Sequence, residues 1–227
     1  KKKKKHGKNI CNFTDIKDGN LAYHVGDKKA NVDRNRKELA LKYNYDYKKL
    51  ISMNQTHGNN VQIVDLKSDK IIDDCDGLIT NVKDLPLMVM IADCIPILLH
   101  DEKKGVIAAL HAGRNSTFLK IVDVAINKMK ENFGTNPCDI KASFGPSIQK
   151  CCYEVSVELV NIVKNSFGSQ FINGRYIDLQ GINKELLINN GVKEINISNI
   201  CTKCTSIVHF SYRKDPKTGR FAGIIKL

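Results

Sequence analysis

Apolar runs along the chain predict a series of short buried strands separated by polar turns. Several of these runs are continuously apolar rather than alternating, which is typical of strands that are covered on both faces. The expected strands are Val61–Asp65, Leu87–Ile91, Ile95–His100, Val106–Leu110, Ile140–Phe144, Glu194–Ile197 and Ala222–Ile225.

Other segments carry apolar residues at helical spacing, bounded by residues that cap or stop a helix. Ser156 suits the first of these roles, and Gly168 suits the second. The expected helices run from Asn115 or Ser116 to about Asn132, from Ser156 to Phe167, and through Ile182 to the stop at Asn190-Gly191, with a fourth within Asp33 to Leu50.

Strands grouped in the middle of the chain, with helices between them, predict an α/β (α+β) layered sandwich in which helices cover mixed sheets. No shift in composition marks a linker, so residues 9–227 are expected to form a single domain. The run Lys1 to Lys5 belongs to a basic tail, residues 1–8, which is expected to be disordered.

The net charge of +12 invites a nucleic-acid partner, but the five lysines of that run account for much of it. RNA-binding motifs are missing, and aromatic residues make up only 7% of the chain, so few bases could stack on it. We therefore expect no specific nucleic-acid partner.

The eight cysteines are scattered, and no apolar segment follows the charged start as it would in a signal peptide. This pattern favours free thiols in a reducing cytoplasm. The longest apolar stretch, Leu85 to Leu99, is too short to span a bilayer, so no membrane partner is expected.

Three short motifs carry the chemistry: Gln55-Thr56-His57-Gly58, Ala92-Asp93-Cys94 and His111-Ala112-Gly113. Cysteine and histidine are preferred zinc ligands, and three protein ligands leave one position open, as in catalytic zinc sites. We expect His57, Cys94 and His111 to form such a site, with Cys94 and His111 at the ends of neighbouring strands.

The same residues allow a second interpretation. A Cys94 thiolate activated by His111 could attack an amide or ester without any metal. The zinc site needs both histidines, whereas the nucleophilic pair needs only one. Asp93 would point to the opposite side of a regular strand from Cys94, so it is expected to support the site or to shape a turn.

Two further features are weaker. Arg36 is well shaped to bind phosphate, although exposed arginines are common. Cys201-Thr202-Lys203-Cys204 is a single CxxC, and Cys151-Cys152 lacks the spacing of a second pair. These cysteines are expected to be structural thiols.

Taken together, the motifs resemble the YfiH-type laccase-domain family, whose members have been described as multicopper polyphenol oxidases and later as purine nucleoside phosphorylases. The resemblance extends from about residue 20 to the end of the chain. The matching blocks are Val25-Gly26-Asp27 with Asn35-Arg36, the three motifs above, Asp76-Gly77-Leu78-Ile79-Thr80, Phe144-Gly145-Pro146-Ser147-Ile148, Cys152-Tyr153-Glu154-Val155, Phe210-Ser211-Tyr212-Arg213 and Thr218-Gly219-Arg220.

The resemblance implies phosphate-dependent cleavage of purine nucleosides such as adenosine and inosine, with adenosine deamination and methylthioadenosine cleavage as further activities. It implies a metal held by His57, Cys94 and His111, with zinc favoured over copper, and nucleoside and phosphate as small-molecule partners. Arg36 and Arg114 would hold phosphate, and Gln55 and Asp93 would orient ligands or the ribose.

Alternatives that the resemblance keeps open are a Cys–His hydrolase or amidase, including one that edits peptidoglycan precursors, and a polyphenol oxidase. With six histidines in all, the chain cannot supply a blue-copper site and a further copper cluster. Where the family usually has Trp after His-Ala-Gly, this chain has Arg114-Asn115-Ser116, and it contains no Trp. A stacking role for that Trp is therefore lost.

Overall fold

The computed structural model describes residues 7–227. Its longer strands are β1 (Ile10–Phe13), β3 (Val61–Ile63), β5 (Gly77–Thr80), β6 (Leu87–Ile91), β7 (Ile95–Asp101), β8 (Val106–Ala112), β9 (Ile140–Phe144), β12 (Glu194–Ile197) and β13 (Phe221–Lys226). Two-residue strands are β2 (Ser52–Met53), β4 (Ile71–Ile72), β10 (Ile172–Asn173) and β11 (Tyr176–Ile177). The α-helices are α1 (Lys29–Tyr43), α2 (Arg114–Phe118), α3 (Ile121–Phe133), α4 (Val157–Ser166) and α5 (Leu179–Asn189).

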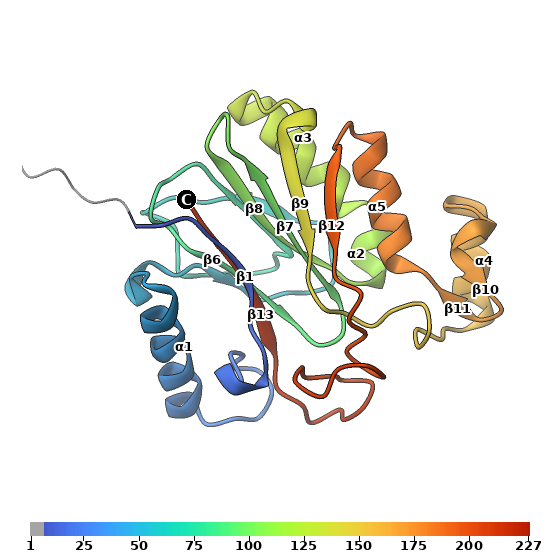
Figure 1. The fold of residues 1–227 in the computed structure, drawn as a ribbon, viewed down its shortest axis with the longest axis horizontal. Helices are drawn as coiled ribbons and strands as arrows, with labels where there is room; N and C mark the ends of the chain where they lie inside the picture. The colour runs from blue at the N-terminus through green and yellow to red at the C-terminus, as the bar shows by residue number, and fades with distance from the viewer. Residues whose placement is uncertain (1–6) are drawn as a thin grey trace, which may run out of the picture.

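Two sheets lie face to face in the middle of the molecule (Figure 1). One has six strands in the order β12-β9-β7-β8-β5-β3, and the other has three in the order β1-β13-β6. Helices α2, α3 and α5 cover the outer face of the larger sheet, and α1 covers the outer face of the smaller one. This arrangement confirms the predicted α/β sandwich of mixed sheets covered by helices.

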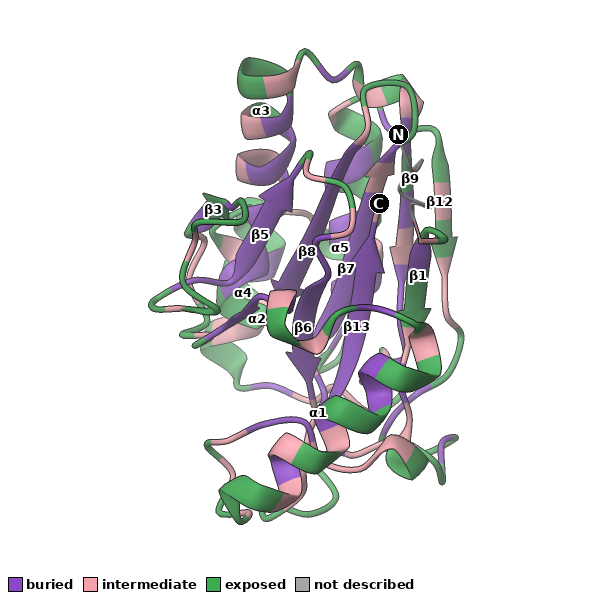
Figure 2. Ribbon diagram, turned by 90° about the vertical axis from the view of Figure 1, so that its left-hand side faces the viewer, coloured by how far each residue is buried: buried purple, intermediate pink, exposed green. Residues whose placement is uncertain are grey.

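The central strands are buried on both faces, as their continuous apolar runs predict (Figure 2). In β8, Ala108 and Leu110 pack among the helices, whereas Ile107 and Ala109 pack against the smaller sheet. In β6, Val89 faces the larger sheet and Met88 faces α1. Because successive side chains of a strand point to opposite faces, one apolar run contributes to the core on each side of its sheet.

Most predicted strands are confirmed within one or two residues, but the helix expected up to Asn132 is interrupted. Lys120 adopts a left-handed backbone, with φ of 56°, and separates α2 from α3. The side chain of Ser156 caps α4 as predicted, by accepting a hydrogen bond from the Leu159 amide. Strands β1 and β5 were not predicted, since neither β1 nor the glycine-initiated β5 forms a long apolar run.

The predicted basic tail, residues 1–8, falls largely on residues that the structure does not describe. At Gly7 the chain is already attached to the domain, because its amide donates to Asp84 Oδ1 at 3.2 Å. Within the described residues, no helix has both the length and the apolar composition needed to cross a membrane.

Leu98 tests the importance of the core between the two sheets, where it is 1% exposed. We expect Leu98→Ala to lower the free energy of unfolding by about 2–5 kcal/mol, because it removes buried methyl groups and leaves a cavity. The control Ile207→Ala, at a side chain 91% exposed, should change it by less than about 0.5 kcal/mol. Chemical denaturation measures both, and equal effects would contradict the described packing.

Candidate metal centre

The register of two neighbouring strands brings Cys94 and His111 together. Strands β7 and β8 are antiparallel, with Ile95 opposite Ala112 and Pro96 opposite His111. Cys94 directly precedes β7, so the two side chains meet at one end of this pair. His111 lies on the same face of β8 as Ile107 and Ala109, which points it toward the space between the two sheets.

His57 comes from the loop that follows β2, and a buried carboxylate fixes that loop. Asp76 accepts hydrogen bonds from the backbone amides of Thr56 at 3.1 Å, His57 at 3.1 Å and Gly58 at 3.0 Å. These bonds hold His57 in a left-handed conformation, with φ of 62°. The exposed ring of His57 then lies edge-on to His111, with 5.0 Å between their centroids.

Asp76 also orients His111. Its Oδ2 lies 2.7 Å from Nδ1 of the His111 ring, and both side chains are buried. Burial opposes ionisation of Asp76, but the hydrogen bond from His111, the charge of His111 and the backbone amides together lower the pKa of this carboxyl. A carboxylate bonded to one ring nitrogen leaves the other free for a metal, as in carboxylate–histidine–zinc arrangements.

The three donor groups fit a single metal ion. One sulfur and two imidazole nitrogens lie within 4.8 Å of one another. Gly113 makes this approach feasible, because a Cβ there would lie 2.9 Å from Sγ of Cys94 and 3.5 Å from Cδ2 of His57. Burial decreases from His111 through Cys94 to His57, so the site opens toward solvent on the side of His57.

The site also stabilises a thiolate. Burial disfavours the charged form of Cys94, yet the charge of His111 and hydrogen bonds from His111 and His57 outweigh it and lower the pKa of the thiol to about 6. Burial likewise opposes the charged form of His111, but Cys94 and Asp76 raise the pKa of its imidazole to about 9. Without a metal, the two therefore form an ion pair at neutral pH.

A cavity of about 80 Å³ lies in front of these residues. Two of the residues that line it, His24 and Arg220, were not predicted to belong to the site. Arg220 lies in a block that resembles the family, so its sequence context could have indicated it; His24 is an isolated histidine with no such signal. The full lining is His24, Gln55, His57, Met90, Ala92, Cys94, His111 and Arg220.

Of the predicted ligand-binding residues, Gln55 lines the cavity, but its amide group pairs with the backbone of Met90 at both ends, at 2.7 and 2.8 Å. Asp93 is buried and points away toward the C-terminal loop, where it accepts from Thr202 Oγ1 at 2.7 Å and from the Arg213 amide at 2.8 Å. Gln55 therefore forms part of the cavity wall, whereas Asp93 supports the site from behind.

The two predicted arginines lie outside this cavity. Arg36 is 5% exposed, and its guanidinium donates to the Leu21 carbonyl at 2.8 Å and lies over the Tyr23 ring. In this structure the donors of Arg36 serve the fold, and its binding of phosphate stays a prediction. Arg114 is exposed at the start of α2, and its charge acts on the phenol of Tyr153.

Comparison with known proteins defines the class of protein. The profile of the family described as "Multi-copper polyphenol oxidoreductase laccase" matches residues 6–227. This chain therefore belongs to that family, which confirms the resemblance drawn from its motifs.

Relatives within the family carry the name purine nucleoside phosphorylase. YlmD of Bacillus subtilis is 31% identical over 224 residues, covering 91% of this chain and 81% of its own. A purine nucleoside phosphorylase of Mycobacterium bovis is 35% identical over 210 residues, covering 91% of this chain and 83% of its own. The crystal structure of Bacillus licheniformis YfiH superposes with a TM-score of 0.89 at 28% identity, covering 96% of this chain and 92% of that one.

Gly113→Ala tests the packing of the centre. The added methyl group must displace the Cys94 sulfur, so we expect metal affinity to fall by about 10-fold or more, since small misplacements of ligands have large effects. Gly58→Ala is the matched control, because a Cβ there meets nothing closer than 3.8 Å. Competitive titration with a chromophoric chelator measures both, and unchanged affinity in G113A would contradict the described geometry.

The thiolate gives a second test. In protein stripped of metal, alkylation of Cys94 by iodoacetamide should rise with pH around a midpoint near 6, because only the thiolate reacts. Below that pH the thiol is protonated and protected. His111→Asn removes the stabilising charge and should move the midpoint upward toward the ordinary value of 9.0. Peptide mass spectrometry follows Cys94 alone, and an unshifted midpoint in H111N would refute the ion pair.

Proposed function

We propose that this chain is a metal-dependent purine nucleoside phosphorylase that prefers zinc. The observation that carries this proposal is the Cys/His₂ donor set, backed by Asp76 and opening on a cavity that Arg220 also lines. The names of the relatives support the reaction, and the donor set supports the metal. The partners in this proposal are a nucleoside and phosphate, both small molecules.

The metal would be held by His57, Cys94 and His111. When bound, a zinc ion supplies Lewis-acid chemistry to an oxygen or nitrogen of the substrate, with its fourth position open. The task of the chain is to keep the donor groups aligned. Asp76 does this, because it fixes the ring of His111 and, through three amides, the loop that carries His57.

In this proposal Arg220, which lines the cavity, binds phosphate. Among the described residues, the side-chain hydrogen bonds of Arg220 are made by Nη1, which donates to the carbonyls of Thr218 at 3.0 Å and Gly219 at 3.1 Å. These bonds direct the guanidinium and leave its other N–H groups for a ligand. Arginine binds phosphate in a bidentate manner that lysine cannot reproduce.

The reaction balances with the groups at hand. An oxygen of hydrogen phosphate bonds to C1′ of the ribose, the bond from C1′ to the purine nitrogen breaks, and the proton of hydrogen phosphate ends on the departing base. His24 lines the same cavity, and in this proposal it relays that proton. Burial, followed by the charges of Arg220 and His57, lowers its pKa, so His24 is neutral at pH 7 and can accept and donate.

The size of the cavity limits what it encloses. Its volume of about 80 Å³ is well below the roughly 300–1,000 Å³ of pockets that enclose a whole small-molecule ligand. Only the reacting end of a nucleoside fits within it, and the remainder of the substrate extends past the exposed His57. Substrate preference in this proposal, including methylthioadenosine cleavage or adenosine deamination, is therefore set by residues around the opening.

A second function is favoured by the ion pair of Cys94 and His111. A thiolate beside an imidazolium is the arrangement of a metal-free cysteine hydrolase or amidase. Polyphenol oxidation has less support from the residues. Two histidines and one cysteine suit a single copper ion, but within residues 7–227 no other cluster of potential ligands contains a histidine.

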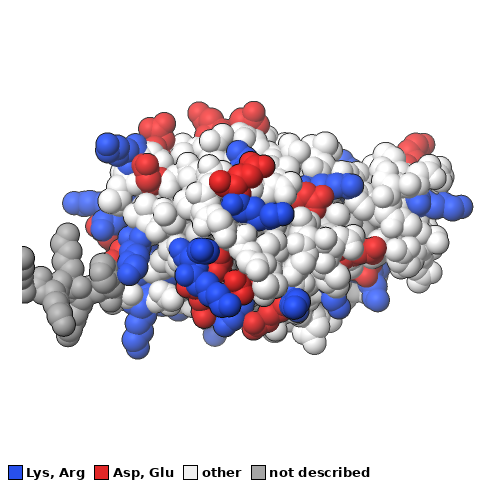
Figure 3. Space-filling model, turned by 90° about the horizontal axis from the view of Figure 1, so that it is seen from above, with Lys and Arg blue, Asp and Glu red and all other residues white. Residues whose placement is uncertain are grey.

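The charge distribution gives little support to a nucleic-acid function. On the face seen from above, Lys and Arg side chains lie among Asp and Glu side chains rather than in one continuous patch (Figure 3). A nucleic-acid groove needs basic groups aligned along the phosphate backbone. The face in this view shows no such alignment of basic groups.

Turnover of adenosine and inosine should require inorganic phosphate and release ribose 1-phosphate in equal amounts with the base. We expect Arg220→Ala to raise the KM for phosphate by about 10- to 150-fold, the equivalent of about 1.5–3 kcal/mol for a hydrogen bond to a charged group. Arg220→Lys should recover part of the loss because it retains the charge. Steady-state kinetics with phosphate and nucleoside varied separately give these constants.

Two controls accompany this test. Arg34→Ala removes an exposed guanidinium of α1 and should leave the KM for phosphate unchanged. Removal of the metal by a chelator should abolish phosphorolysis and leave a metal-free amidase intact. Base release at the same rate without phosphate, or amide hydrolysis that survives the chelator, would refute the phosphorylase.

A further inference from the structure

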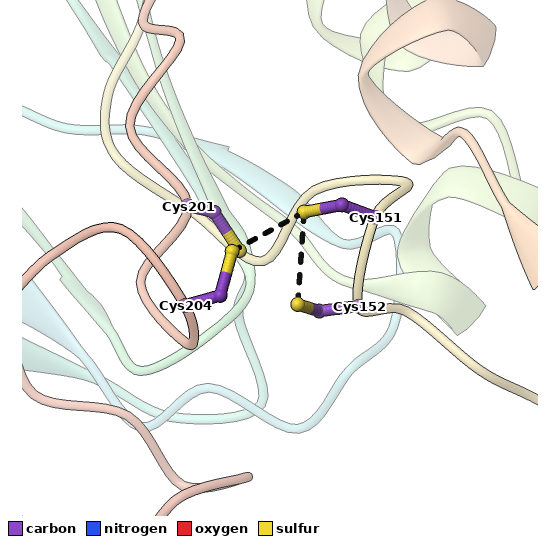
Figure 4. Close-up of side chains that lie close together, drawn as sticks. All are labelled: Cys151, Cys152, Cys201 and Cys204. Carbon is purple, nitrogen blue, oxygen red and sulfur yellow. Dashed lines mark hydrogen bonds between the residues drawn. The ribbon is translucent and has the colours of Figure 1, made fainter.

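Four cysteines that are distant in sequence meet at a second position. The thiol groups of Cys151, Cys152, Cys201 and Cys204 converge from two loops (Figure 4). Cys151 Sγ lies 3.6 Å from Cys152 Sγ and 3.5 Å from Cys204 Sγ, and all four sulfurs lie within 4.8 Å of one another. All four are free thiols, so the structure does not cross-link them.

Sheet topology explains why the two loops meet. Strands β9 and β12 are parallel neighbours, so the loops that follow them leave the same edge of the sheet. Beyond the strands, the backbone continues to pair. The Ser147 amide donates to the Ile200 carbonyl at 3.3 Å, and the Thr202 amide donates to the Ser147 carbonyl at 3.1 Å. The fold therefore brings the thiols of Cys151 and Cys152 next to those of the single CxxC.

We propose that these four cysteines form a second metal centre, which holds one Zn²⁺ through four thiolates. At a Zn–S distance of about 2.3 Å, neighbouring sulfurs of a tetrahedral site are about 3.8 Å apart. The observed separations, from 3.5 Å up to 4.8 Å, lie around that value. One ion would satisfy all four sulfurs after small side-chain rotations.

The surroundings suit a charged centre. Four thiolates and one zinc ion carry a net charge of −2, and Lys150 and Lys203 directly flank the ligands in sequence. The backbone groups of Lys203 and Cys204 hydrogen-bond to the sulfur of Cys201, which is 2% exposed. Amide hydrogen bonds to a metal-bound sulfur stabilise its negative charge.

Four protein ligands leave no open position, so this centre is structural rather than catalytic. The metal would hold the two loops against the segment that leads into the first site. Thr202, inside the CxxC, donates to Asp93 Oδ1 at 2.7 Å, and Asp93 directly precedes Cys94. Tyr153, which directly follows Cys152, stacks under the guanidinium of Arg213. Zinc binding at the cysteines would therefore position the segment that presents Cys94.

Metal content tests the proposal without reference to any activity. Protein purified with reductant, and without added metal or chelator, should contain two zinc ions per chain when its metal content is measured by inductively coupled plasma mass spectrometry. C201S/C204S should contain about one, whereas C138S, at an exposed cysteine outside the cluster, should retain two. A zinc content in C201S/C204S equal to that of the unmodified protein would overturn the proposal.

The first site provides the complementary control. His57→Ala should lose the zinc ion of the first site and retain the one at the cysteine cluster. The two proposals can therefore fail independently: an empty first site leaves the cysteine centre standing, and an empty cysteine cluster leaves the proposed function standing. Cobalt substituted into H57A should show the intense sulfur-to-cobalt absorption of a site with four thiolates. Absence of that absorption contradicts four-thiolate binding.

A measurement on unmodified protein covers the case in which the cysteine variants do not fold. With zinc bound, Cys151, Cys152, Cys201 and Cys204 should resist alkylation while Cys138 reacts, and a chelator should expose all four together. Resistance that is removed by reductant rather than by chelator would show a disulfide in place of the metal and would refute the proposal.

Discussion

A single buried carboxylate organises the first site. Asp76 accepts hydrogen bonds from three consecutive amides of the His57 loop and from Nδ1 of His111. Removing it would leave those amides without their partner and would free the imidazole to rotate. An unpaired buried polar group costs about 1–3 kcal/mol, so the loop conformation and the orientation of His111 depend on this one side chain.

The strand architecture then supplies what Asp76 cannot. Antiparallel pairing of β7 with β8 fixes the separation of Cys94 and His111, and Asp76 itself directly precedes the neighbouring strand β5. Backbone hydrogen bonds set this register, and a slip of one residue would turn each side chain to the other face. Two of the three proposed ligands, Cys94 and His111, are thus held at paired strands of the larger sheet, as precise ligand geometry requires.

The loops behind the site connect it to the cysteine cluster. Asp93 joins them, since it accepts from Thr202 of the CxxC and from the backbone of Arg213. On the other side, Arg114 occupies the position where the family usually has Trp, and the side-chain amide of the next residue, Asn115, donates to the His57 carbonyl at 2.7 Å. Asn115 therefore supports the loop that carries His57 directly.

The sequence by itself determined the sandwich, most strands and the three metal-ligand candidates, because each depends on a local pattern: continuous apolar runs, capping residues, and cysteine or histidine at a strand end. It could not place Arg36 or Arg220, since burial of a guanidinium depends on contacts between distant segments. It also could not predict the cysteine cluster, because about fifty residues lie between Cys151-Cys152 and the CxxC. Only the parallel pairing of β9 with β12 brought those thiols together, because strand pairing is decided by packing over the whole chain.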